Sequence, residues 1–409
     1  MVDKAGEAGC KPRGPGGISR RELLTAAGTA CLGGLLTAVP GIGQAQTTSG
    51  DRPMILLRSS WQTVNIGDIT HTPGALRLLV NHLRGVQIGL WPVSVGDGVQ
   101  EMLQAAFPSV RIVKGRVGSA GKPDSDELQR AFEETRLLVH GSGPSVVAYK
   151  DLAAWHATTA KPFGILGVTV GSVNEELKEL LSAASFIFCR DTLSLDVLRK
   201  AGVACPIMEF APDATFAFDM RDEARGTAYL QAHGLEDRKF ICVIPRLRFT
   251  PYHKIRKTTN WTPEHIEEVE RVNDETKERD HAKLREVIIS WVRETGLKVL
   301  ACPEMTYEVE VAKELLVDPL PAEVKEKVVW RDSYWLPDEA ASVYARARAL
   351  VSFEMHSPII AAAVGTPAIH VRQPTDTSKG QMWRDIGLGE WLFEVDEAQG
   401  SDIYAALKG

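Results

Sequence analysis

The residues most suited to acid–base chemistry lie in one short segment, Ser352-Phe-Glu-Met-His-Ser-Pro358. We predict that a strand ends at Phe353, and Ser357 and Pro358 are typical of the cap and the first residue of a helix. His356 therefore falls at the positive N-terminal end of a helix, where it can meet an anion or donate a proton. A single histidine is usually structural, but this position leads us to predict a functional role for His356.

Cationic side chains that could hold an anionic ligand follow other strands. Arg246 and Arg248 come just after the apolar run 240–244. In extended backbone, residues two apart point to the same side. Two guanidinium groups on one face form an anion clamp, and ordinary surface charge is the alternative. Lys379 supplies another cation in the polar loop 375–380.

Two loops of the first half contain residues suited to ligand contact. In Asn65-Ile-Gly-Asp68, the side chains of Asn65 and Asp68 either cap the following helix or contact a ligand hydroxyl. The second loop opens with Gly141 and Ser142 after the apolar run 137–140. Its glycines allow the backbone to approach a ligand closely, although a single glycine-rich loop is a weak signal.

An arginine and an aspartate that follow neighbouring strands form a further candidate. Arg190 comes after the apolar run 186–189, and Asp213 comes after the run 207–210. Arg190 either pairs with an acid or faces the cleft, and Asp213 is either a turn residue or the group that fixes Arg190.

Strands that alternate with helices must position these residues. This alternation predicts a parallel, doubly wound α/β sheet, and it restarts near residue 240. We predict two Rossmann-like domains that face a cleft, residues 53–225 and 226–409, as in the glycosyltransferase-B architecture. Ligands bind beyond the carboxyl ends of such strands, which is where the candidate residues lie. The expected strands are 54–57, 86–91, 110–113, 137–140, 163–168, 186–189, 207–210, 240–244, 298–301, 328–330, 349–353 and 368–371.

Helices are expected between several of these strands. Thr262 is a typical cap for a long charged helix that runs to residue 295, with a possible break at Asn273-Asp274. The other expected helices are 73–83, 126–136, 192–201, 308–316, 338–348 and 358–364.

Residues 1–45 are predicted to be an export signal, followed by a linker at 46–52. Arg20-Arg21 precedes a moderately apolar run that ends in small residues, which favours the twin-arginine route. The alternative, a membrane anchor, fits less well because the run contains several glycines and a proline. Cys31 lies inside this run rather than after it, which argues against a lipoprotein. We therefore expect the export machinery as a partner and a periplasmic or extracellular location.

Charge and cysteine content limit the possible functions. The leader has five basic and three acidic residues, so the rest of the chain has 42 basic and 50 acidic residues, a net charge of −8. An acidic chain is a poor candidate for binding nucleic acid, so an anionic ligand must be held by a local cluster. The four cysteines beyond the leader lie in apolar runs without a C-x-x-C pair, which predicts buried free thiols and no cysteine metal site.

Together these motifs resemble the polysaccharide pyruvyl transferase family, over most of the mature chain and in the family's order. The matching features are Asn65–Asp68, Gly141–Ser145, Phe186–Asp191 with Ser194 and Leu198, Pro212-Asp213, and His356 followed by Gly365-Thr366-Pro367. The resemblance implies a two-Rossmann fold and the transfer of pyruvate from phosphoenolpyruvate to a polysaccharide or oligosaccharide as a ketal.

This chemistry needs groups that hold a phosphate and a carboxylate, an acid for the methylene carbon, and a group that activates a sugar hydroxyl. It needs no metal and no cofactor. We assign the acid to His356 and activation of the hydroxyl to Asp68. The donor is assigned to Arg246, Arg248, Ser357 and Lys379, and the acceptor to Asn65, Gly141, Ser142 and Arg190.

The sequence departs from the family at Glu354, where members commonly have an arginine two residues before the histidine. An acid there would repel phosphoenolpyruvate. Either Lys379 or Arg372 replaces the missing cation, or the donor differs, or this branch has lost the transfer reaction. The alternatives to pyruvyl transfer are a glycosyltransferase that uses a nucleotide-sugar, with Glu354 on the ribose, and an exported glycan-binding protein without catalysis.

Overall fold

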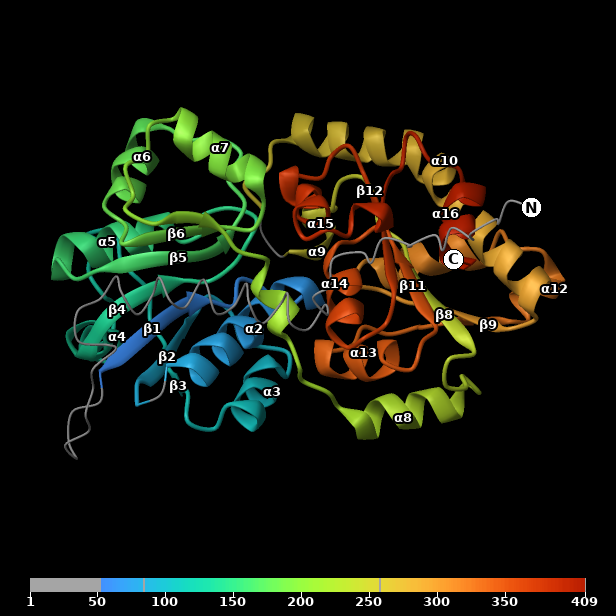
Figure 1. Ribbon diagram of the computed structural model, residues 1–409, viewed down its shortest axis with the longest axis horizontal. Coiled ribbons are helices and arrows are strands. Elements are labelled where there is room, and N and C mark those ends of the chain that lie inside the picture. Colours follow the sequence, from blue (N-terminus) through green and yellow to red (C-terminus); the bar gives the residue numbers. More distant parts are fainter. Residues whose placement is uncertain (1–52, 84, 257–258, 409) are drawn as a thin grey trace, which may run out of the picture.

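A computed structural model describes residues 53–83, 85–256 and 259–408. The predicted leader and linker lie outside these residues. The described chain forms two α/β domains side by side, coloured blue to green and yellow to red in Figure 1. None of the described helices is long and apolar enough to cross a membrane.

The first domain is built on a parallel sheet of seven strands in the order β3-β2-β1-β4-β5-β6-β7. The apolar runs of the sequence form these strands because both faces of the sheet are covered by helices. The strands are β1 (Met54–Ser59), β2 (Gln87–Pro92), β3 (Arg111–Ile112), β4 (Thr135–His140), β5 (Phe163–Val168), β6 (Phe186–Cys189) and β7 (Met208–Phe210). The helices are α2 (Ile66–His82), α3 (Val99–Ala106), α4 (Asp126–Glu134), α5 (Tyr149–Thr159), α6 (Glu175–Ser182), α7 (Thr192–Lys200) and the short η1 (Ala214–Ala217).

The second domain repeats the design with six parallel strands in the order β10-β9-β8-β11-β12-β13. The strands are β8 (Phe240–Ile244), β9 (Lys298–Ala301), β10 (Val328–Trp330), β11 (Ala349–Ser352), β12 (Ala368–Arg372) and β13 (Leu392–Glu394). Its helices include α8 (Glu223–Ala232), α9 (Tyr252–Ile255), α10 (Pro263–Thr295), α11 (Glu308–Val311), η2 (Ala312–Val317), α12 (Ala322–Lys325), α13 (Pro337–Tyr344), α14 (His356–Ala363), η3 (Ser378–Gly380), α15 (Gln381–Asp385), η4 (Gly389–Trp391) and α16 (Gly400–Lys408). The expected two-domain doubly wound fold is therefore confirmed.

Strand order reverses at one place in each sheet, between β1 and β4 and between β8 and β11. Loops leave in opposite directions at such a switch point, so a crevice opens at the carboxyl ends of the two strands. The loops that carry the candidate residues 60–68, 141–147, 245–252 and 353–356 follow these four strands. The fold thus provides two crevices, one in each domain.

The two domains share one apolar core. The buried residues of this core come from the helices α2, α3, α8, α13 and α14 and from both sheets. Backbone hydrogen bonds also cross the seam, since Ile66 N donates to Glu304 O (3.0 Å) and Thr306 N donates to Val64 O (3.0 Å). The predicted boundary at 225/226 falls inside α8, which packs on α13 of the second domain.

Two helices differ from the expectation. α2 begins seven residues before Pro73, because the Asn65 side chain accepts hydrogen bonds from the N–H groups of Gly67 (2.6 Å) and Asp68 (3.2 Å). α10 runs unbroken through Asn273, whose side chain bonds the backbone of Phe249 at both its N–H and its carbonyl (2.9 Å each). The capping role expected for Thr262 is confirmed, and the four described cysteines are free.

Gly74 allows α2 to lie against η1, and its replacement is the first test of the fold. A Cβ at Gly74 would stand 2.0 Å from the carbonyl oxygen of Ala214. Gly74→Ala should lower the free energy of unfolding by about 2 kcal/mol, although alanine in a helix ordinarily gains about 1 kcal/mol over glycine. The change is measured from urea unfolding. Gly171→Ala is the control, because its Cβ would meet nothing within 4 Å. Equal stability of the two variants would contradict this close packing.

Candidate active site between the two domains

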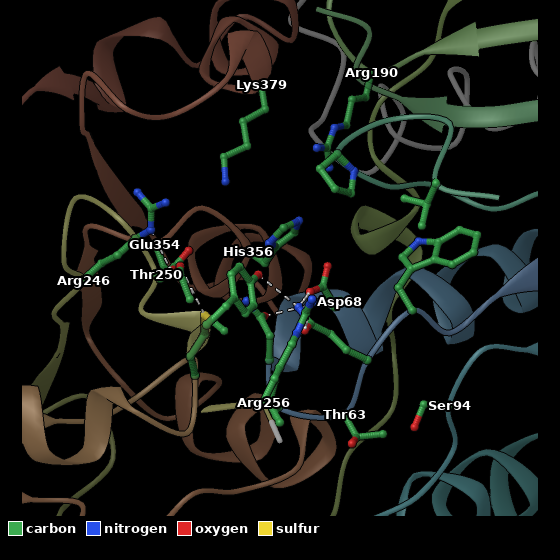
Figure 2. A pocket seen from close by; sticks show the side chains of 18 residues that line it. Thr63, Asp68, Ser94, Arg190, Arg246, Thr250, Arg256, Glu354, His356 and Lys379 are labelled. Atoms are coloured by element: carbon green, nitrogen blue, oxygen red, sulfur yellow. Dashed lines mark hydrogen bonds and ion pairs between the residues drawn. The ribbon is translucent and has the colours of Figure 1, made fainter. Parts of the chain in front are cut away.

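A cavity of about 500 Å³ lies where the two crevices meet (Figure 2). The first domain contributes the segments after β1, β2, β4 and β6, and the second contributes those after β8, β9, β11 and β12. Its lining residues are Trp61, Gln62, Thr63, Val64, Asn65, Asp68, Ser94, Pro144, Val147, Arg190, Arg246, Thr250, Tyr252, Arg256, Met305, Glu354, His356 and Lys379. Chain segments far apart in sequence thus form one site.

His356 lines this cavity as the first residue of α14. A carboxylate from another loop, and not Ser357, accepts the hydrogen bond at the helix start. Glu304 Oε2 accepts from the Ser357 N–H (2.6 Å), and Glu304 Oε1 lies 3.3 Å from His356 Nδ1. The Ser357 hydroxyl instead accepts from the Tyr344 hydroxyl (3.2 Å) and is fully buried, away from the lining. The structure therefore places Ser357 behind the cavity wall, not among the donor-facing groups.

Burial sets the protonation of this pair. It lowers the pKa of His356 to about 4, against the opposing effect of Asp213. It also raises the pKa of Glu304 to about 7, although the bonds from Ser357 work in the other direction. At neutral pH the imidazole is uncharged, and Glu304 is close to its midpoint. His356 Nε2 has no hydrogen-bond partner among the described residues.

Asp213 is the centre of a buried ion-pair network beside His356. Its carboxylate accepts from Arg190 (2.6 Å) and contacts His71 Nδ1 (2.9 Å), and it lies 3.9 Å from His356 Nε2. Burial alone would raise the pKa of Asp213, but His71 and Arg190 hold it well below its usual value. Asp213 also accepts from the N–H of Thr215 (2.9 Å). Both roles considered for Asp213 thus occur together, and Arg190 both pairs with it and lines the cavity.

A metal site is one further possibility at this network. The side chains that could supply ligand atoms are His71, Asp213 and His356, whose ligand atoms all lie within 4.8 Å of one another. The Arg190 guanidinium already occupies one carboxylate oxygen of Asp213 at 2.6 Å. A metal cation would have to displace this charge or lie next to it, at a repulsive distance. The local charges therefore favour an ion-pair network over metal coordination.

The two arginines expected to form a clamp point to different places. Arg246 lines the cavity but is paired with Glu354 (3.0 Å) and Asp376 (2.7 Å). Arg248 binds Asp280 (2.6 Å) and Asp396 and does not reach the cavity. The alternation argument fails here because the chain leaves extended structure at the end of β8. A clamp of two guanidinium groups is therefore absent from the described site.

Glu354 determines the electrostatics of this wall. Burial alone would lower the pKa of Arg246, yet Asp376 and Glu354 raise it, so the guanidinium is firmly charged and already neutralised. Burial raises the pKa of Glu354, an effect that Arg246 partly offsets. Two carboxylates thus share one arginine beside the cavity.

Lys379 is a cation of the second-domain wall that is held less tightly than Arg246. Figure 2 shows it extending into the cavity from the side opposite Arg256. Its ammonium lies 3.7 Å from Asp376, beyond hydrogen-bond distance. Arg372, the other candidate to replace the missing arginine, pairs with Glu394 (2.8 Å) and is not among the lining residues. The geometry therefore favours Lys379.

Some of the first-domain candidate residues line the cavity, and others lie behind its wall. Asn65 and Asp68 line the cavity, and Asp68 accepts a hydrogen bond from Gln62. Ser142 lies behind the wall, where its hydroxyl contacts His71 Nδ1 (2.8 Å). Gly141 is also behind it, because a Cβ there would stand 2.5 Å from the hydroxyl of Ser59. Pro144 and Val147 of the same loop face the cavity instead.

Sequence reasoning missed His71, Glu304 and Trp61. His71 lies within α2 and Glu304 follows β9, and neither belongs to a local motif. The position of Glu304 just after a strand next to the switch point was the one available signal. Trp61 lies before the Asn65–Asp68 motif, outside the residues on which that prediction rests.

The strand order and the shared cavity define the class as a two-domain α/β protein of the GT-B type. Solved structures agree, each covering 87% of this chain. One is UDP-GlcNAc 2-epimerase from Neisseria meningitidis bound to UDP-GlcNAc, with a TM-score of 0.52, 9% sequence identity and 90% of that chain covered. Another is S. aureus MnaA with UDP, with a TM-score of 0.51, 10% identity and 87% of that chain covered. A third is Anabaena Alr3699/HepE with UDP-glucose, with a TM-score of 0.50, 10% identity and 88% of that chain covered. At these identities the likeness concerns the fold alone. No curated protein matches the sequence.

The model of the polysaccharide pyruvyl transferase family matches residues 94–373. The protein belongs to this family, as its motifs led us to expect. By family it is a transferase of polysaccharide biosynthesis.

Removal of the Asp213 charge tests the buried network. Asp213→Asn should lower the free energy of unfolding at pH 7 by about 3 kcal/mol, because it leaves the Arg190 guanidinium buried without a counter-charge. The folded-state pKa of Asp213 is depressed, so its contribution is present above pH about 4 and is lost as the pH falls further. The difference between parent and variant should therefore shrink in acid, as measured by urea unfolding at several pH values.

Asp219→Asn is the matched control, since Asp219 pairs with Arg77 at 2.8 Å but is 54% exposed. Its loss should cost less than about 1 kcal/mol. Similar losses in the two variants would contradict a special role for the buried pair.

Proposed function

We propose that this protein transfers pyruvate from phosphoenolpyruvate to two hydroxyl groups of a saccharide, forming a ketal and releasing inorganic phosphate. The proposal depends chiefly on one observation. His356, at the N-terminus of α14, faces a cavity that also contains Lys379 and Asp68 from opposite domains. A proton donor, a cation and a carboxylate therefore surround one space large enough for a small donor and a sugar.

The donor would be bound on the second-domain side. The Lys379 ammonium suits the phosphate or the carboxylate, whereas the N-terminus of α14 already binds the Glu304 carboxyl group. Arg246 contributes less, because Glu354 and Asp376 already neutralise it. Arg256 lies at the exposed rim of the cavity. Its guanidinium stacks on the Tyr252 ring (4.1 Å) and donates to the Gln62 side-chain oxygen (2.8 Å), and it forms no ion pair with a carboxylate of the described residues.

The proton for the methylene carbon would come through His356. A protonated Glu304 can donate to His356 Nδ1, which places the hydrogen of the neutral imidazole on Nε2. As Nε2 gives this proton to the methylene carbon, Nδ1 takes the proton of Glu304, and the adjacent donor carbon becomes an oxocarbenium-like centre. The His356 ring thus passes on a proton without having to carry a charge before the reaction starts.

The acceptor would be bound on the first-domain side. A saccharide hydroxyl attacks the oxocarbenium-like carbon, and its proton passes to the Asp68 carboxylate. A second hydroxyl then displaces the phosphate, which leaves with that hydroxyl's proton, and the ring of the ketal closes. The hydrogen bond from Gln62 holds the Asp68 carboxylate in place.

Replacement of His356 tests its role as the proton donor. His356→Ala should lower the transfer rate at least about a hundredfold, the usual size of a general-acid contribution. Release of phosphate from phosphoenolpyruvate in the presence of an acceptor is measured. His82→Ala, at an exposed histidine at the end of α2, is the control and should keep full activity. An unchanged rate in His356→Ala would remove this assignment.

The charge of the donor wall gives a second test. Glu354→Gln leaves the Arg246 guanidinium with one carboxylate fewer. We therefore expect this variant to bind phosphoenolpyruvate about tenfold more tightly than the parent does. Lys379→Met should weaken the same binding about tenfold or more. Both are followed by calorimetric titration. The opposite order of the two affinities would show that phosphoenolpyruvate is not bound at this wall.

A second candidate, an exported glycan-binding protein, is favoured by the pairing of Arg246 with Glu354 and by the leader. We propose that the leader directs twin-arginine export, and phosphoenolpyruvate and nucleotide-sugars are cytoplasmic metabolites. Thermal-shift measurements separate the candidates. Stabilisation by phosphoenolpyruvate supports pyruvyl transfer, stabilisation by a nucleotide-sugar supports a glycosyltransferase, and stabilisation by acidic oligosaccharides alone supports the glycan-binding protein.

A further inference from the structure

The two walls of the cavity differ in chemistry. The second-domain wall carries the charged groups Arg246, Arg256, Glu354 and Lys379, together with the imidazole of His356. The first-domain wall carries an indole, aliphatic side chains and neutral hydrogen-bonding groups, namely Trp61, Val147, Pro144, Gln62, Asn65, Thr63 and Ser94, together with Asp68. The Arg190 charge on this side is already neutralised by Asp213 at 2.6 Å. The first-domain wall is thus suited to an uncharged polyhydroxylated ligand.

Trp61 is fixed in position on this wall. Its Nε1–H donates to the Ser142 carbonyl (2.7 Å), and its ring lies against His140 at 4.8 Å with an angle of 33°. Burial lowers the pKa of His140 to about 3, so this supporting ring is uncharged at neutral pH. Gly143 leaves room for the indole, because a Cβ there would stand 2.9 Å from Trp61 Nε1.

The backbone before Trp61 is also unusual. Ser60 has a φ of +62°, a left-handed conformation that is unfavourable for residues other than glycine. The Ser60 hydroxyl donates to the Ser94 carbonyl (2.5 Å), and the Ser60 carbonyl accepts from Val93 and Ser94. The chain therefore turns sharply between β1 and Trp61, which allows the indole to reach the cavity.

An exposed apolar side chain lies on the same wall as this indole. Val147, 41% exposed, lines the cavity with Trp61, and Val93, 50% exposed, precedes the lining residue Ser94 in the chain. Large aliphatic side chains with this exposure are few in the described chain, so the exposed Val147 together with one fixed aromatic ring indicates a binding surface.

We propose that the Trp61 face is the subsite for one pyranose ring of a neutral saccharide acceptor, whose apolar C–H face stacks on the indole. The assignment builds on the proposed function, because it identifies the class of acceptor. A ring on Trp61 is held between the neutral hydrogen-bonding groups and Asp68, which receives the proton of the attacking hydroxyl. The charged wall opposite is left to the donor.

Binding of cellotetraose, mannotetraose and N-acetylchitotetraose, measured by calorimetry without any donor, tests this assignment. The parent should bind at least one of them, and Trp61→Ala should weaken that binding about tenfold or more. Trp61→Phe retains an aromatic face and should lose less than about threefold. Gly143→Ala keeps the indole but pushes on its Nε1, and it should resemble Trp61→Ala.

Leu193→Ala is the control, because Leu193 is 46% exposed and does not line the cavity. Circular dichroism confirms that each variant is folded. A parent that binds none of the three saccharides, or equal affinities in parent and Trp61→Ala, would overturn the proposal. The proposal would also be overturned if the parent bound UDP more tightly than any of the three saccharides and if Trp61→Ala lost this UDP binding. The Trp61 face would then hold a nucleotide base.

Failure of pyruvyl transfer is recognised separately. Phosphoenolpyruvate binding should be unaffected by Trp61→Ala, so absence of that binding in the parent counts against the proposed donor and not against the saccharide subsite.

Discussion

The arrangement of the site depends on one shared carboxylate. Asp213 stands at the seam and holds Arg190 and His71 of its own domain while it faces His356 of the other. A buried charge is tolerated only when a counter-charge and hydrogen-bond donors satisfy it, so Arg190 and the His71 imidazole must lie where they are for Asp213 to remain ionised. Asp213, Arg190 and His71 are almost fully buried, so little water reaches this network to weaken it.

The same rule explains the donor wall. Glu354 brings a second carboxylate to Arg246, which Asp376 already neutralises. The position at which the resemblance leads us to expect an arginine is thus occupied by an acid that belongs to an internal ion pair, while Lys379 is held only loosely by Asp376. Binding strength for an anion in such a wall depends on which cations are unpaired, not on how many cations are present.

The fold could be predicted from the sequence because buried parallel strands form continuous apolar runs that are easy to recognise, as in β5 and β8. Short elements such as β13, with three residues, gave no such signal. Asn273 suggested a break in α10 because asparagine is a common helix terminator, but its side chain serves the backbone of Phe249 instead. Local patterns thus predict elements well and their exceptions poorly.

The site was only partly predictable, for a related reason. His356 and Asp68 were found because each follows a strand at a switch point, which is a topological rule. Arg248 was misplaced because the rule of alternating side chains holds only while the backbone stays extended. His71 could not be found and Glu304 had only its place after β9 as a signal, since the contacts of both are with residues more than 50 positions away in the sequence.

The pair of backbone hydrogen bonds across the seam, from Ile66 to Glu304 and from Thr306 to Val64, ties the loop of Asn65 and Asp68 to the loop of Glu304 in the other domain. Together with the shared apolar core, these bonds hold the two walls of the cavity at one spacing. Asp68 on one wall and the Glu304–His356 pair on the other are therefore set at a fixed separation before any ligand binds.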